Sequence, residues 1–83
     1  MNIQDLKGEI LKCVKMSTGF EINYPELAPI EAVPIVEGKI IHVIDIIDTH
    51  IIAKGLPFYG TFKVNKNNLS EHFVVADTGE PID

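Results

Sequence analysis

The first part of the chain carries apolar residues at the three- and four-residue spacing of an amphipathic helix. The residues that would share one helix face are Ile3, Leu6, Ile10, Cys13 and Val14. Asn2 is a favourable N-cap, and Gly19 is a favourable residue just after a helix C-terminus. Gly8 lies inside the pattern and costs about 1 kcal/mol relative to Ala in a helix. The spacing predicts a helix over residues 2–18.

Three prolines punctuate residues 24–34, and each removes a backbone donor and favours extended geometry in the residue before it. The stretch is too apolar for a free linker because Leu27, Ile30 and Val33 lie within it. We expect an ordered arm that wraps over the core. The alternative is a docking segment for a groove on a partner protein.

Residues 39–48 repeat two apolar residues and one polar residue three times, a period that fits neither a strand nor a helix well. In a helix, His42, Asp45 and Thr49 would form one polar stripe. The density of β-branched residues favours a strand instead. We favour the strand for residues 39–54 and leave the helix open.

Residues 58–64 and 72–76 have the composition of strands, and the polar residues 65–68 between them predict a hairpin with a long loop. Together these patterns predict an α+β fold, in which the N-terminal helix packs on a small, mainly antiparallel β-sheet. A chain of 83 residues is expected to form a single domain, with its β-rich part over residues 35–77.

Composition narrows the classes of function. The net charge is −5 and the chain has no Arg, so it would repel a nucleic-acid backbone and lacks the usual side chain for bidentate phosphate recognition. Charged residues interrupt the most apolar stretch, residues 40–53, so no membrane span is expected. The single Cys13 cannot form an intramolecular disulfide, which favours the cytoplasm of a cell or of an infected host.

The densest group of potential metal ligands is His42, Asp45, Asp48 and His50. Imidazole and carboxylate groups can bind Zn²⁺ or Mn²⁺, but the spacing matches no specific metal signature. Solvated polar positions on an amphipathic element are the better interpretation, and we expect no metal and no other cofactor. Cys13 belongs to the apolar set of the first segment, so we expect a buried thiol and not a nucleophile.

Six aromatic residues are available as anchors for a partner protein. Phe58 and Tyr59 lie between Gly55 and Gly60 in a turn that cannot bury all its side chains, and Tyr24 begins the proline-rich arm. These three are the predicted partner-binding residues, although Phe58 could instead cap the core of the hairpin.

The sequence carries no catalytic motif, so the predicted function is that of a small acidic, non-catalytic protein-binding module. An inhibitor, an immunity factor or an accessory factor of a bacterium or phage would fit this description. We also expect self-association as a homodimer, through a strand edge near residues 40–47 or through the 58–59 turn. The alternatives are a small metal-dependent enzyme that uses His42, Asp45, Asp48 and His50, or a structural subunit of the kind found in virions.

Overall fold

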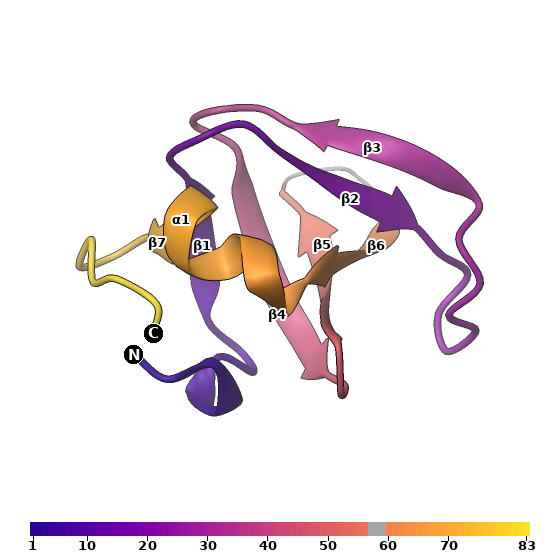
Figure 1. The fold of residues 1–83 in the computed structure, drawn as a ribbon, viewed down its shortest axis with the longest axis horizontal. Helices are drawn as coiled ribbons and strands as arrows, with labels where there is room; N and C mark the ends of the chain where they lie inside the picture. Colours follow the sequence, from indigo (N-terminus) through magenta and orange to yellow (C-terminus); the bar gives the residue numbers. More distant parts are fainter. Residues whose placement is uncertain (57–59) are drawn as a thin grey trace.

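In the computed structural model, which describes residues 1–56 and 60–83, the chain forms a seven-stranded antiparallel sheet (Figure 1). The strands are β1 (Ile10–Cys13), β2 (Ser17–Glu21), β3 (Glu31–Ile35), β4 (Ile40–Ile46), β5 (His50–Gly55), β6 (Thr61–Asn65) and β7 (Phe73–Val75). The described helices are short: the 3₁₀ turns η1 (Ile3–Asp5) and η2 (Lys66–Asn68), and α1 (Leu69–His72).

Neighbouring strands follow the order β3-β2-β6-β5-β4-β1-β7. β2 and β3 form a hairpin, β4, β5 and β6 form a meander, and β1 pairs with both β4 and β7. Figure 1 shows the β2–β3 hairpin crossing above the other strands. The sheet therefore bends around its inner face, and the core lies inside this bend.

Buried and exposed side chains alternate along the strands, and the buried ones form the core. In β1, Leu11 and Cys13 are buried whereas Lys12 between them is exposed, as expected for a strand with one face turned inward. Leu6, Leu69 and Ile82 come from the segments outside the strands and close the core. The buried cluster consists of Leu6, Leu11, Cys13, Ile35, Ile41, Val43, Ile51, Ala53, Phe62, Val64, Leu69, Phe73, Val75 and Ile82.

The predicted helix over residues 2–18 is wrong, and so is the α+β fold class that depended on it. Only Ile3–Asp5 forms a helical turn, and the segment then runs through β1 to the first two residues of β2. Gly8 has a φ angle of 89°, in the left-handed region that residues with a Cβ rarely adopt. Beyond Gly8 the buried residues follow a period of two, because Leu11 and Cys13 face the core.

For residues 39–54 the strand alternative is correct, since they form β4 and β5. The register of this pair shifts between Val43 and Asp45, as at a β-bulge. A bulge inserts one extra residue into a strand and so breaks the alternation of its side chains. This irregularity explains why the apolar spacing did not have a period of two.

The predicted hairpin over residues 58–76 is wrong. β6 pairs with β5 and β2, whereas β7 pairs with β1 at the far end of the sheet. The polar residues between them do not form a tight turn but run through η2 into α1, and the Asn65 side chain accepts a hydrogen bond of 2.8 Å from the Asn67 backbone N–H.

Among the described residues, no helix is long and apolar enough to cross a membrane.

Candidate interaction surface

The two edges of the sheet differ in how they are covered. At the β7 edge, the Val75 N–H donates to the Glu80 carbonyl at 2.9 Å, and Val74 forms a bridge with Pro81. The N-terminal amine holds this segment in place through the Pro81 carbonyl and the Glu80 carboxylate, both at 2.8 Å. The C-terminal residues therefore cover this edge.

The outer edge of β3 has no neighbouring strand within residues 1–56 and 60–83. Pro34 is the fourth of the five residues of β3 and lies opposite Thr18 of β2. A proline cannot donate a hydrogen bond to a neighbouring strand, so it is tolerated at the edge of a sheet and not at its centre. By contrast, β4 pairs with β1 over Ile40–His42 and with β5 over Ile41–Ile46, so neighbouring strands occupy both sides of the first part of the dimerisation edge predicted near residues 40–47.

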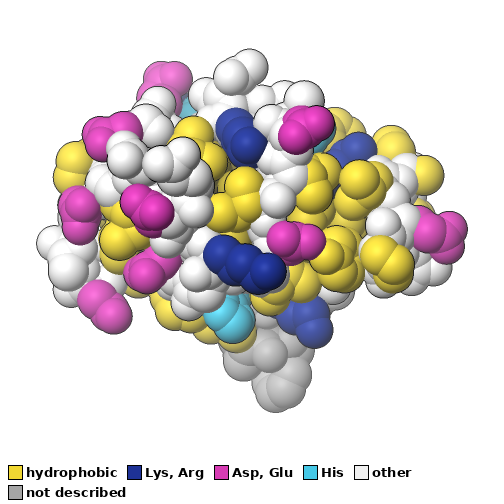
Figure 2. All heavy atoms as spheres, turned by 90° about the horizontal axis from the view of Figure 1, so that it is seen from below, with side chains coloured by type: hydrophobic (Ala, Val, Ile, Leu, Met, Phe, Trp, Pro, Cys, Tyr) yellow, Lys and Arg dark blue, Asp and Glu magenta, His cyan; other side chains and the backbone are white. Residues whose placement is uncertain are grey.

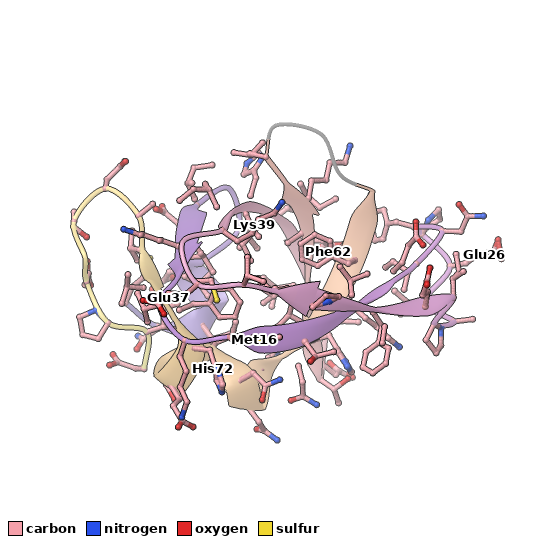
Figure 3. All side chains as sticks on the ribbon, turned by 90° about the horizontal axis from the view of Figure 1, so that it is seen from above. Met16, Glu26, Glu37, Lys39, Phe62 and His72 are labelled. Carbon is pink, nitrogen blue, oxygen red and sulfur yellow. The ribbon has the colours of Figure 1, made fainter. Side chains whose placement is uncertain are left out.

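A groove of about 260 Å³ adjoins the β3 edge. Its walls are mainly apolar, and Glu21 and Lys39 are its two charged lining residues. In the β2–β3 ladder, Gly19, Glu21, Val33 and Ile35 occupy alternate positions of the inner face. Figure 3 shows Lys39 and Phe62 on the same side of the hairpin, between Glu26 at one end and Glu37 at the other. The lining residues are Glu21, Val33, Pro34, Ile35, Val36, Lys39, Gly60, Thr61 and Phe62.

Gly19 permits close packing beneath this groove. A Cβ added at Gly19 would lie 3.1 Å from the Phe62 ring, 3.1 Å from the Lys63 carbonyl oxygen and 3.3 Å from the Ile35 side chain. These distances are tighter than ordinary contacts, and one of the three neighbours is backbone that cannot rotate away. The small residue in β2 thus allows Phe62 and Ile35 to approach the hairpin.

Residues 22–30 lie against part of the outer face of the sheet, at β4 and β6. Asp45, Ile52, Lys63 and Phe20 lie side by side in register across β4, β5, β6 and β2. Ile52 is fully buried although it is outside the main cluster, and Ile22 is 3% exposed. Their burial creates a second, smaller apolar layer on the outer face.

Two side-chain hydrogen bonds tie this covering segment to the sheet. The Tyr24 hydroxyl donates to the Asp45 carboxylate, and the Lys63 ammonium donates to the Leu27 carbonyl at 2.8 Å. The bond from Tyr24 lowers the pKa of Asp45, and the Ile46 backbone N–H and the Lys7 ammonium act in the same direction. The same bond raises the pKa of Tyr24.

The β2–β3 hairpin and its connection carry most of the exposed apolar surface. Outside residues 57–59, eight large hydrophobic residues are exposed, and five of them fall between residues 20 and 36: Phe20, Tyr24, Leu27, Ile30 and Val36. Figure 2 shows hydrophobic side chains gathered on the right of the lower face, where the connection lies, with a few acidic side chains among them. Contiguous apolar surface of this kind is typical of sites that bind other macromolecules.

Charge is also uneven along the chain. Residues 17–37 contain four Glu and no Lys, Arg or His, so they hold −4 of the net −5. Glu21 and Glu31 are directly opposite each other in the β2–β3 ladder, an arrangement in which like charges repel. The hairpin and its connection therefore combine apolar side chains with a net negative charge of their own, and Lys39 and Lys63 of other segments lie beside them.

Of the predicted partner-binding residues, Phe58 and Tyr59 lie outside the described residues. Tyr24 is 41% exposed, but its hydroxyl binds Asp45 and so helps to hold the hairpin connection in place. Only part of its ring remains available to a partner. The β3 edge was not predicted from the sequence, although Pro34 within a short apolar stretch was a signal for an edge strand.

The structure does not assemble the metal site considered for His42, Asp45, Asp48 and His50. Across residues 1–56 and 60–83, no three His, Cys, Asp or Glu side chains come together as they would around a metal ion. Asp45 binds Tyr24, and His50 Nδ1 lies 2.6 Å from the hydroxyl of its neighbour Thr49. Burial lowers the pKa of His50, and Lys63 adds to this effect.

Cys13 is buried in the core, as predicted, although it lies on a strand and not on a helix. Burial raises the pKa of its thiol, which disfavours the reactive thiolate. The thiol donates to the Lys15 carbonyl at 3.1 Å. This environment is that of a structural cysteine.

Compared with known proteins, the chain matches no family model, no curated protein and no solved structure.

Proposed function

We propose that the protein is a small, non-catalytic protein-binding module that receives its partner at the outer edge of β3. The observation that carries this proposal is an edge that no strand of residues 1–56 and 60–83 pairs with, beside an apolar groove. The same hairpin and its connection hold most of the exposed large apolar side chains of these residues. An exposed strand edge with an apolar groove beside it supports strand addition, in which backbone hydrogen bonds supply affinity and side-chain pockets supply selectivity.

An inhibitor, an immunity factor or an accessory factor could each use such a surface. The single buried thiol suits a reducing compartment, so we place this activity in the cytoplasm of a cell or of an infected host. Homodimerisation through β3 is a weaker interpretation. It would bring together two hairpins that each carry four Glu and no basic residue.

Two exposed valines provide a matched test. Val36 lines the groove and is 53% exposed, whereas Val14 is 41% exposed and lies outside the hairpin. An aspartate at either position costs the fold little, because surface substitutions usually change stability by less than about 0.5 kcal/mol. Wild-type protein, Val36→Asp and Val14→Asp are each immobilised and exposed to a lysate of the source organism.

We expect a protein captured by wild type and by Val14→Asp to be lost with Val36→Asp. Capture that is equal for all three proteins, or absent for wild type, would contradict the proposal. Melting curves of the three purified proteins provide the control for folding.

A further inference from the structure

We infer that the partner presents an extended, basic segment that adds as a strand to β3 and places one apolar side chain in the groove. This inference rests on the proposed function and names the chemistry of the partner at the same site. Three features of the hairpin support it: the geometry of the edge, the size of the groove and the sign of the charge.

The edge fixes the conformation of the segment. β3 spans five residues, Glu31–Ile35, and its outer backbone groups are the ones that an added strand would use. Side chains along an added strand point alternately to the two faces of the sheet. Every second side chain of the segment would therefore point to the inner face, where Glu31, Val33 and Ile35 lie. Pro34 supplies a carbonyl but no N–H, so the paired stretch is short.

The size of the groove indicates how many apolar side chains of the added segment it can hold. Its volume of about 260 Å³ is smaller than that of typical small-molecule sites, which are roughly 300–1,000 Å³. A single branched or aromatic side chain suits this space better than a cofactor does. Val33, Ile35 and Phe62 form apolar walls that such a side chain would contact.

The negative charge of the hairpin favours basic side chains at the other positions of the added segment. Glu21 and Glu31 repel each other on the inner face, and a Lys or Arg of an added strand would lie near both carboxylates and relieve this repulsion. Glu26 and Glu37, at the two ends of the hairpin, extend the negative potential along the direction of the strand (Figure 3). The same charge opposes a second copy of the chain, since its own β3 would bring further glutamates to the edge.

Three labelled peptides of equal length test the inference by fluorescence anisotropy. The first alternates Lys and Val around a central Leu, the second replaces each Lys by Glu, and the third repeats the first with N-methyl groups on alternate backbone nitrogens. Strand addition requires backbone donors, so the third peptide separates it from simple charge attraction.

We expect the first peptide to bind with a Kd in the micromolar range, and the other two at least about tenfold more weakly. Its affinity should fall as salt is raised, because exposed charges are screened. Glu21→Gln and Glu31→Gln should each weaken it about two- to fivefold at low salt, as for exposed ion pairs. Asp77→Asn, at an exposed position outside the hairpin, should leave its affinity unchanged.

Equal binding of all three peptides, or no binding of the first up to about 1 mM, would overturn the inference. So would a dimer of this chain, detected by light scattering, that the first peptide does not dissociate. The proposed function and this inference can be distinguished by experiment. If Val36→Asp abolishes capture of a partner whose binding is indifferent to salt and to both Glu variants, the module binds at β3 but its partner is not basic.

Discussion

Replacing Ile52 by Ala tests whether residues 22–30 form a second apolar layer on the outer face of the sheet. Ile52 is fully buried, lies between Asp45 and Lys63 in register, and is held under the segment that Tyr24 and Lys63 tie down. Substitution of a buried Ile by Ala costs about 2–5 kcal/mol, and the cost is lowest where neighbours can move into the space. Since a loop covers Ile52, we expect a loss of about 2–3 kcal/mol.

The assay is urea unfolding followed by far-ultraviolet circular dichroism. A domain of 83 residues has a free energy of unfolding of roughly 4–12 kcal/mol, so the variant should still fold. The expected loss corresponds to a fall in Tm of roughly 10–20 °C. Ile40→Ala is the matched control, because Ile40 lies in the neighbouring strand and is only half-buried. We expect it to cost about half as much.

A loss below about 1 kcal/mol for Ile52→Ala would refute this reasoning, because it is the size expected for a side chain near the surface. Equal losses for the Ile52 and Ile40 variants would refute it as well. Either result would mean that residues 22–30 do not shield Ile52 from water in solution.

Three further predictions concern single positions. Gly8→Ala should lower the free energy of unfolding by about 1–2 kcal/mol, because φ at Gly8 is 89° and a Cβ is strained at this angle. An added Cβ would meet no atom within 4 Å, so this effect would come from the backbone angle and not from a clash, and a neutral variant in urea unfolding would contradict it. Ser17→Ala should be neutral or stabilising in the same assay, since the buried Ser17 hydroxyl has no hydrogen-bond partner among residues 1–56 and 60–83, and a loss above about 1 kcal/mol would show that it has one in solution. Tyr24→Phe should raise the pKa of Asp45 toward its ordinary value, as measured by an NMR titration of the carboxyl carbon. Because the folded-state pKa is lowered, the stability that Asp45 contributes is present above its unfolded value near pH 4 and is lost as the pH falls through the folded value. The Tyr24 variant should lose less stability over this acid range, and an unchanged titration would contradict the prediction.

The strands that could be predicted from the sequence are those with dense β-branched residues. β4 and β5 were identified in this way, and the bulge near Val43 explains why their spacing was ambiguous. The first segment could not be assigned correctly, because five apolar residues at helical spacing also satisfy a short turn followed by a strand. Gly8 was the local sign against a helix, but its backbone angle is visible only in the structure.

Local sequence patterns could not predict which strands pair with one another. β1 pairs with β7 through Leu11 and Val75, residues 64 positions apart, and no turn between the two strands specifies this contact. The candidate site had the same limitation. The proline-rich arm and Tyr24 were singled out from the sequence, but the edge position of β3 follows from the order of all seven strands.

The position of the β3 edge depends on the contacts that hold residues 22–30, the connection between β2 and β3, against the sheet. Residues 22–30 bury Ile52 on the outer face, and the Ile30 N–H donates to the Glu21 carbonyl at 2.8 Å as the chain enters β3. The bonds of Tyr24 and Lys63 fix this segment on β4 and β6, so they also fix the direction in which β3 leaves it. A chain this small buries a limited fraction of its surface. One segment therefore serves two purposes, since it completes the outer apolar layer and aligns the strand edge at which we propose that a partner adds.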